Sequence, residues 1–232
     1  MSPIDLRNPG RPIRVGVILF NTLTEQLDVA PLGYFSSISR EFLEETPFPD
    51  EFKKGAPEFT FHWVNEDGKK PGELTGNMKV TPTDSFATCP PLDIAIVGAM
   101  SFNYKPTEAE IAFLRKTHDD CTALLLVCFG SQPALLAGLL EGKTAAAPRP
   151  ALATLQQSSP GVNWVKKRYV RDGKIWTTGS LLNGFDMVAA FGRETWGGDG
   201  AVFDVMTLEC AWPDRDVDYK DAAEWNLGSW MY

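Results

Sequence analysis

The sequence predicts an α/β fold in which helices cover both faces of a doubly wound, parallel sheet. Three observations predict it: short apolar runs of strand length, helical patterns between them, and the alternation of the two along the chain. An apolar run without alternating polar residues is typical of a strand buried on both faces of a parallel sheet. The 232 residues, 44% of them hydrophobic and 22% charged, suit one globular domain over residues 1–232.

The first half of the chain alternates between strand and helix. Arg14–Phe20 is the first expected strand, and a helix is expected from roughly Glu25 to Phe42, with Pro31 in a first turn that begins near Asp28. Residues 43–58, which carry three prolines and mixed charge, predict an exposed insertion. Further elements are expected as strands at residues 59–64 and 93–97, an extended segment at 78–86, and a helix at 106–118 that Thr107 and Glu110 open as a capping box.

The second half predicts a hairpin, two helices and an aromatic tail. The expected elements are a hairpin at residues 168–178, turned at Asp172-Gly173, and helices at about 183–195 and 201–210. The tail carries Trp212, Trp225 and Trp230. Because exposed tails rarely hold so many tryptophans, residues 214–232 are expected to pack on the body of the domain or on a partner subunit.

Cys128 stands at the corner around which the fold is organised. The apolar run Cys121–Val127 ends there, and a helical pattern follows over residues 134–140, with Gly142 as its expected C-cap. Such a corner aims a side chain at the N-terminal end of the helix. The free N–H groups and positive dipole there favour a thiolate, and can lower a cysteine pKa to roughly 3.5–7.5. Cys128 is therefore a candidate nucleophile; the alternative is a small, inert, buried cysteine.

The loops that follow the other buried strands are expected to meet Cys128. In open α/β sheets the ligand binds beyond the carboxyl ends of the strands, which brings residues 21–31 and 98–104 to the same edge. Asp28 is the nearest carboxylate. It either caps a helix or, beside a thiol in an apolar pocket, holds a proton or positions a water.

The same edge offers candidate groups for binding a substrate. The backbone N–H groups of Ala99, Met100 and Phe129 are candidates for stabilising a developing negative charge, although the glycine before them serves a tight turn equally well. The side chains of Met100, Phe102, Phe129 and Trp176 are expected to line an apolar pocket, with core packing as the alternative.

Composition and motifs exclude several classes of function. The net charge of −8 opposes nucleic-acid and anionic-membrane partners, which need a basic face. The four cysteines include no C-x-x-C, so we expect free thiols, a cytoplasmic protein and no metal or nucleotide cofactor, since phosphate-loop and zinc motifs are also missing. His62 within a strand and His118 at a helix end are expected to be structural.

These residues resemble the ThiJ/PfpI superfamily, whose fold is flavodoxin-like, of the class I glutamine amidotransferase type. The resemblance rests on Val127–Ser131 followed by Ala137–Lys143, and it covers about residues 14–213, the expected core. Four further segments match the isonitrile hydratase branch: Gln26–Pro31, Cys89–Ile94, Arg171–Gly179 and Gly184–Asp186.

The resemblance implies a homodimer without a cofactor that acts on a small molecule. Cys128 would be the nucleophile and Asp28 its carboxylate partner, with Thr178 and Gly179 at the substrate pocket. In this branch a thiolate attacks the terminal carbon of an isonitrile, and the adduct is hydrolysed to an N-substituted formamide.

Three residues depart from the branch's usual pattern. Phe129 stands in place of a threonine and removes a hydroxyl, Met100 replaces a glycine, and Pro148 stands in place of a histidine. Four hypotheses follow: a cysteine-dependent lyase of the isonitrile hydratase kind, an enzyme acting on reactive carbonyls, a tailoring enzyme for one natural product, and a non-catalytic thiol sensor. The first is favoured, because an isonitrile accepts a thiolate without expelling a leaving group.

Overall fold

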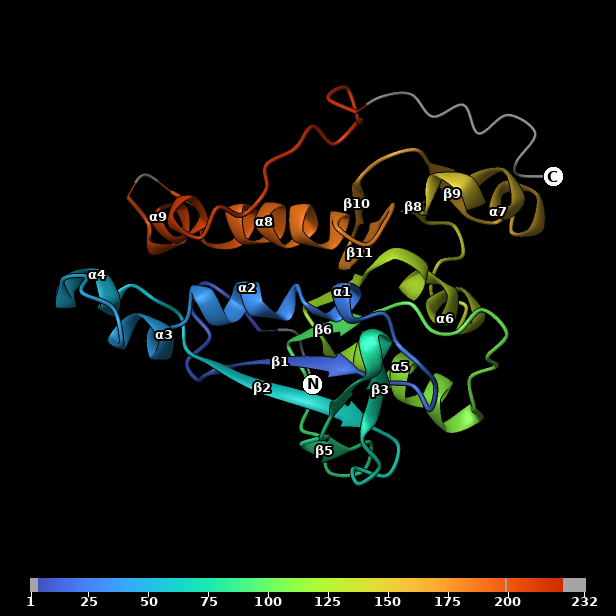
Figure 1. The fold of residues 1–232 in the computed structure, drawn as a ribbon, viewed down its shortest axis with the longest axis horizontal. Helices are drawn as coiled ribbons and strands as arrows, with labels where there is room; N and C mark the ends of the chain where they lie inside the picture. The colour runs from blue at the N-terminus through green and yellow to red at the C-terminus, as the bar shows by residue number, and fades with distance from the viewer. Residues whose placement is uncertain (1–3, 199, 223–232) are drawn as a thin grey trace.

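Seven strands form the central sheet of the molecule (Figure 1). They are β1 (Ile13–Ile18), β2 (Phe59–Asn65), β5 (Asp84–Ser85), β6 (Ile94–Val97), β7 (Ala123–Leu126), β10 (Tyr169–Asp172) and β11 (Ile175–Thr178). Their order across the sheet is β10-β11-β7-β6-β1-β2-β5, and every neighbouring pair is parallel except β10 and β11. The structure, a computed structural model, describes residues 4–198 and 200–222.

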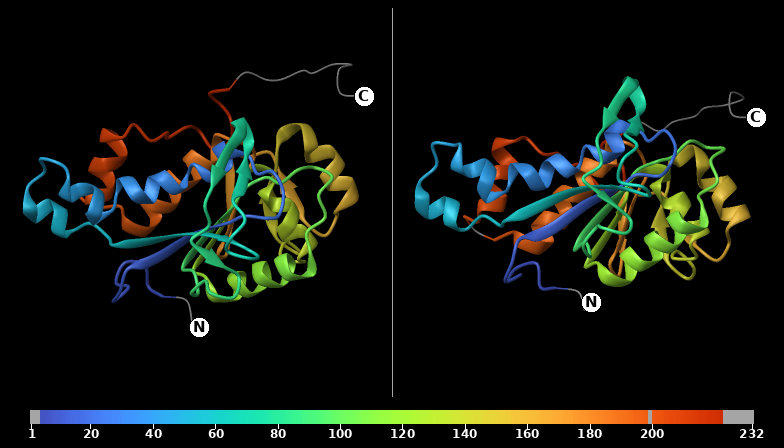
Figure 2. Two further views of the ribbon diagram at one scale, coloured as in Figure 1. Left: turned by 60° about the horizontal axis from the view of Figure 1, so that its bottom comes forward. Right: turned by 90° about the horizontal axis from the view of Figure 1, so that it is seen from below.

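Helices cover both faces of this sheet (Figure 2). The helices are α1 (Gln26–Val29), α2 (Leu32–Ser37), α3 (Arg40–Glu44), α4 (Asp50–Lys54), α5 (Glu108–Asp120), α6 (Ser131–Leu136), α7 (Leu152–Ser158), α8 (Asn183–Trp196) and α9 (Val202–Glu209). Buried side chains of α2, α8 and α9 form one core cluster with the sheet, and those of α5 and α6 form a second. This layering confirms the predicted α/β fold.

Two small sheets stand outside the central one. An antiparallel ribbon of β3 (Gly72–Leu74) and β4 (Met78–Val80) projects from it (Figure 2), and β8 (Thr144–Ala146) pairs in parallel with β9 (Asn163–Val165). The elements β8, α7 and β9 were not predicted from the sequence. Their segments are too short for a recognisable period.

The capping box at the start of α5 is confirmed. Thr107 Oγ1 accepts a hydrogen bond from the N–H of Glu110 at 3.1 Å, and the Glu110 carboxylate accepts one from the N–H of Thr107 at 2.7 Å. All the residues involved are close together in the chain, and for this reason the pattern could be recognised from sequence.

Two helix predictions were wrong in their bounds. The helix expected from Glu25 to Phe42 is three short helices, because Pro31 interrupts the first and Ser39 caps a new one by accepting a hydrogen bond from the Phe42 N–H. The helix after Cys128 begins earlier and ends at Leu136, where Gly138 (φ +76°) turns the chain, so Gly142 is not its C-cap.

The C-terminal part of the described chain folds back over the domain. Trp212 packs edge-on against Tyr34, with ring centroids 4.9 Å apart, and its indole N–H donates to Ser37 Oγ at 3.2 Å. Trp225 and Trp230 lie outside the described residues.

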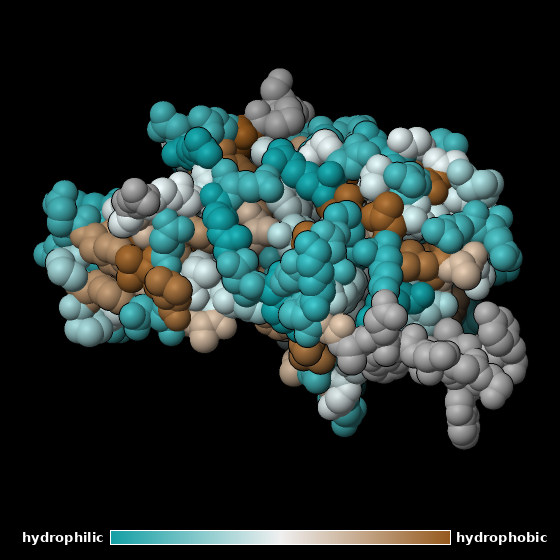
Figure 3. Space-filling view, turned by 90° about the horizontal axis from the view of Figure 1, so that it is seen from above, coloured by the Kyte–Doolittle hydropathy of each residue, from teal (hydrophilic) through white to brown (hydrophobic). Residues whose placement is uncertain are grey.

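The surface seen from above carries small apolar patches separated by hydrophilic residues (Figure 3). Over residues 4–198 and 200–222 we find no helix whose length and apolar character would let it cross a lipid bilayer.

Candidate active site

Cys128 occupies a sharp corner directly after β7. Its φ of +55° lies in the left-handed region, where residues other than glycine are uncommon, and it opens a single 3₁₀ turn, Cys128–Gly130. The Cys128 N–H donates a hydrogen bond to Thr178 Oγ1, at 2.8 Å, from the end of the neighbouring strand β11. A strained backbone persists only where its surroundings hold it. Thr178 supplies part of that hold.

Gly130 allows this corner to lie against strand β6. A Cβ atom at Gly130 would stand 2.1 Å from the carbonyl oxygen of Val97, which real structures do not tolerate. Glycine is therefore required here for close approach, since its φ of −59° is one that any residue adopts.

We predict that Gly130→Ala destabilises the protein by about 2–4 kcal/mol, because backbone rather than a movable side chain blocks the added methyl. Gly33→Ala is the matched control: Gly33 is exposed in α2, and a methyl group added there would meet nothing within 4 Å. This control is expected to stabilise the protein by about 0.5–1 kcal/mol. Urea unfolding followed by circular dichroism measures both. Equal effects at the two positions would contradict the packing argument.

Asp28 is a buried carboxyl group whose charge acts on Cys128. It lies in α1, fully buried, and its Oδ2 accepts a hydrogen bond from the Ala99 N–H at 2.7 Å, while its Oδ1 has no hydrogen-bond partner among the described residues. Burial raises the pKa of Asp28 from 3.8 to about 7, because an ionised carboxylate here is poorly solvated; the nearby Glu25 adds to the rise and the Ala99 N–H opposes it. Asp28 can thus take up and release a proton near neutral pH.

The helix end was predicted to favour a thiolate at Cys128, with an inert buried cysteine as the alternative, and the surroundings of the sulfur oppose the thiolate. Cys128 is only 7% exposed, and burial, with the charges of Asp28 and Glu25, raises its thiol pKa from 9.0 to about 12. Hydrogen bonds from the backbone N–H groups of Phe129 and Leu181 act in the opposite direction, but they are outweighed. The resting group is a neutral thiol.

The predicted N–H groups behave differently from one another. That of Phe129 faces the Cys128 sulfur. That of Ala99 donates to Asp28, so it is not available to a substrate, and the prediction for it was wrong. Leu181, which the sequence analysis missed, supplies the second N–H from the loop after β11; no sequence motif marks it.

Two aromatic side chains, those of Phe102 and Phe129, contact each other at the Cys128–Gly130 turn. Phe102 is 72% exposed, an unusual state for phenylalanine, and its ring meets that of the half-buried Phe129 edge-on, with centroids 5.1 Å apart. Both were predicted to line an apolar pocket. Phe102 is thus an exposed aromatic side chain in contact with the turn that Cys128 opens.

Two other predicted pocket residues belong to the core. Met100 is 4% exposed and lies in the cluster beneath α5 and α6, whereas Cys128 lies in the cluster of the opposite face. Trp176 is 2% exposed, packs edge-on against Phe191 and borders a hollow with residues 4–7, near the amino ends of the strands. For both side chains the structure selects the alternative of core packing, which sequence alone could not decide because it does not show to which face of the sheet they point.

Thr178 and Gly179 lie next to Cys128, where they stabilise the turn of the backbone. Thr178 is fully buried and accepts the Cys128 N–H, and Gly179 is covered by Tyr219 from the C-terminal segment. They hold the corner rather than face an open cavity.

Both histidines of the chain lie away from Cys128. His62 pairs with Asp84 at 2.8 Å beside strand β2, and His118 lies 3.3 Å from Asp119 at the end of α5. Within residues 4–198 and 200–222, no three His, Cys, Asp or Glu side chains gather as a metal site. Asp28 and Glu25 are the carboxylates whose charges act on the Cys128 thiol.

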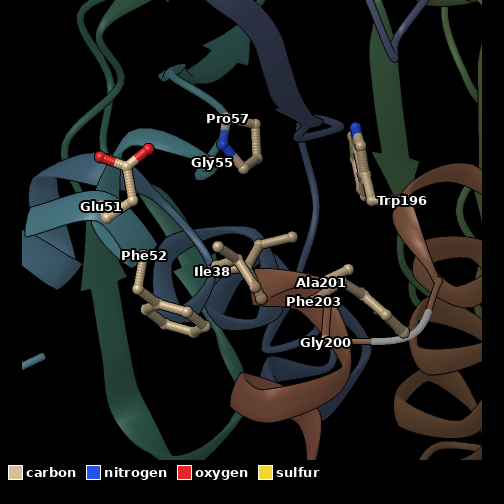
Figure 4. A pocket seen from close by; sticks show the side chains of 10 residues that line it. Ile38, Glu51, Phe52, Gly55, Pro57, Trp196, Gly200, Ala201 and Phe203 are labelled. Atoms are coloured by element: carbon tan, nitrogen blue, oxygen red, sulfur yellow. The ribbon is translucent and has the colours of Figure 1, made fainter. Parts of the chain in front are cut away.

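An apolar pocket of about 270 Å³ lies at the other end of α2 (Figure 4). Ile38, Phe52 and Phe203 face the same space there, with Trp196 at its side. Its lining comes from α2, α4, α8 and α9 and their connections, and none of it from the loops that carry Cys128 and Asp28.

Comparison with known proteins gives one curated relative and several structural neighbours. The isonitrile hydratase of Pseudomonas putida is 32% identical to this chain over 168 residues, which are 70% of this chain and 71% of the relative. A ThiJ/PfpI family protein from Pseudomonas syringae superposes with a TM-score of 0.69 at 16% identity, over 92% of this chain and 80% of that protein. DJ-1 of Schizosaccharomyces pombe gives 0.63 at 13% identity, over 87% and 100%. No protein-family model matches the chain.

These similarities agree with the fold described above. The structural neighbours share the flavodoxin-like, glutamine amidotransferase-like fold, and the alignment with the sequence relative covers more than two thirds of that protein. The chain belongs to the ThiJ/PfpI superfamily, in its isonitrile hydratase-like branch.

Proposed function

We propose that this protein hydrates isonitriles to N-substituted formamides, with Cys128 as nucleophile and Asp28 as the group that carries the proton. The observation that carries the proposal is a buried thiol beside a buried carboxyl group that titrates near pH 7 and keeps one oxygen free of partners. The sequence similarity to an isonitrile hydratase supports the choice of reaction.

The first step adds the thiol across the terminal carbon of the isonitrile. Asp28, ionised, takes the S–H proton at its free Oδ1, the sulfur forms a bond to the carbon, and the proton passes from Asp28 to that same carbon. The product is a thioimidate, R–N=CH–S–Cys128, and no leaving group is expelled.

The second step consumes one water. Water adds to the thioimidate carbon while the nitrogen gains a proton, the C–S bond then breaks, and the sulfur recovers a proton through Asp28. The formamide R–NH–CHO leaves, and the thiol and acid return to their starting states. The N–H groups of Phe129 and Leu181 stabilise the sulfur whenever it carries negative charge.

One proton carrier is enough for this reaction. An acyl transfer needs a base for the nucleophile and an acid for the leaving group, which a histidine usually provides. Here neither histidine reaches the site, and the addition to an isonitrile needs only that one proton move from sulfur to carbon. A carboxyl group with a pKa of about 7 suits transfer in both directions at neutral pH.

The proposal is tested by incubating the purified protein with cyclohexyl isocyanide at pH 7.5. Loss of the isonitrile and appearance of the formamide proton, both followed by NMR, are the expected result. No formamide under conditions in which the protein is folded contradicts the proposal, and lactate formed from methylglyoxal in its place would favour carbonyl chemistry.

The size of the isonitrile substituent that the site accepts is expected to depend on Phe129. We predict that Phe129→Thr raises kcat/KM for a bulky isonitrile, relative to methyl isocyanide, by about ten-fold. The change removes the ring next to Cys128 and keeps the backbone N–H. Phe42→Thr, the same change at a 43% exposed position in α3, is the control and should leave the ratio unchanged. An unchanged ratio in Phe129→Thr would show that the ring does not limit the substrate.

A further inference from the structure

The C-terminal strap, residues 213–222, crosses the molecule at the end of β11. Figure 1 shows it running back from α9 along α8 toward β10 and β11. The N–H of Arg168 donates to the carbonyl of Val217 at 2.8 Å, and the Arg168 side chain pairs with Asp221 at 2.6 Å. The strap is therefore fastened to the segment just before β10.

Tyr219 is the centre of this strap. Its side chain is buried, and the guanidinium groups of Arg149 and Arg168 lie over its ring, 4.8 and 4.7 Å from the centroid. The Tyr219 hydroxyl donates to Asn183 Oδ1 at 2.7 Å, and a Cβ atom at Gly179 would stand 2.4 Å from that hydroxyl. With a φ of +62°, Tyr219 holds a conformation that bulky residues rarely adopt.

Arg215 of the strap also fixes the loop between β11 and α8, residues 179–182. Arg215 donates to both oxygens of Asp186, at 2.9 and 2.6 Å, and to the carbonyl of Leu182 at 3.0 Å. Asp186 is 1% exposed in its side chain and also accepts a hydrogen bond from Asn183 at 3.2 Å. Because a buried carboxylate requires its partner, Arg215 locks the start of α8 to the strap.

The loop held in this way is the one that surrounds Cys128. Thr178, directly before Gly179, accepts the Cys128 N–H, and Leu181, two residues after Gly179, turns its N–H to the sulfur. The contacts thus form a chain from Tyr219 through Gly179 and Asn183 to both groups that position the thiol.

We propose that Tyr219 is a positioning residue for the nucleophile: by resting on Gly179 and holding Asn183, it orients the Thr178 hydroxyl and the Leu181 N–H around Cys128. The strap acts through the loop and touches neither the sulfur nor a substrate. The expected effect of Tyr219 on kcat rests on the proposed function. Its expected effect on the reactivity of the Cys128 thiol does not.

The test compares Tyr219→Ala, which removes ring and hydroxyl, with Tyr219→Phe, which keeps the ring between the two arginines. The second-order rate constant for alkylation of Cys128 by iodoacetamide is measured from pH 7 to 9.5, with peptide mass spectrometry to assign the site. We expect a fall of about ten-fold for Tyr219→Ala and about three-fold for Tyr219→Phe, since the sulfur anion loses an aligned donor. In the hydration assay kcat should fall in the same order while KM stays within about two-fold.

Leu43→Ala is the control for lost stability alone. Leu43 is fully buried in α3, far from the loop, so this variant is destabilised by about 2–5 kcal/mol but should keep the wild-type alkylation rate. A wild-type rate in folded Tyr219→Ala overturns the proposal. So does a faster rate, which would mean that the strap only covers the sulfur. If the wild-type protein forms no formamide, the function fails and the alkylation result still decides the role of Tyr219.

Discussion

Replacing Cys128 with alanine is expected to lower formamide production by at least about 10³-fold, to the level of the uncatalysed reaction. In the proposed reaction the sulfur is the atom that bonds to the isonitrile carbon, and no other nucleophile occupies the corner after β7 in the described chain. Alanine accepts the φ of +55° at the same cost as cysteine, so the fold should remain intact.

The matched control for this prediction is Cys121→Ala. Cys121, like Cys128, is buried (0% and 7% exposed), but it lies two residues before the amino end of β7, away from the site. It should retain activity. Rates are measured by NMR with cyclohexyl isocyanide, and activity surviving in Cys128→Ala would exclude covalent catalysis by this sulfur.

Asp28→Asn is expected to have opposite effects on activity and on the alkylation rate of Cys128. Activity should fall by about 10²–10⁴-fold, because the amide keeps the hydrogen bond from Ala99 but cannot carry a proton. The alkylation of Cys128 should become faster, because the charge of Asp28 is one of the causes that raise the thiol pKa. A purely structural role for Asp28 would not separate the two rates in this way.

The stability of Asp28→Asn should depend on pH in a defined direction. The folded pKa of Asp28, about 7, lies above the unfolded value of 3.8, so the folded state binds more protons between these values and the wild type loses stability as pH rises through them. At about 1.4 kcal/mol per pKa unit, the variant gains up to about 4 kcal/mol over the wild type above pH 7 and nothing below pH 4. Urea unfolding at pH 4, 6 and 8 measures the gain. A pH-independent difference would show that the carboxyl group does not titrate as described.

The parts of the site that could be predicted from sequence are those set by neighbours in the chain. The apolar run before Cys128 and the glycine after it mark a strand that turns sharply, and Thr107 with Glu110 marks a helix start. Asp28 was found because the topology of a parallel sheet brings the loops after β1 and β7 to one edge.

The predictions that failed concern properties that depend on residues distant in the sequence. The thiol pKa was predicted from the helix that follows Cys128, whereas burial and the charge of Asp28, 100 residues earlier, decide it. Trp176 was expected either in an apolar pocket or in the core; it turns to the face covered by α8 and packs on Phe191. Neither outcome has a local signal in the sequence.

The contacts that complete this site come last along the polypeptide. The hydroxyl that accepts the Cys128 N–H lies 50 residues downstream, and Tyr219 lies further still. During synthesis on the ribosome, the sulfur therefore emerges long before the residues that fix its surroundings. A nascent chain that has released β7 carries an unsupported thiol, and only one extended past Tyr219 can assemble the surroundings of Cys128.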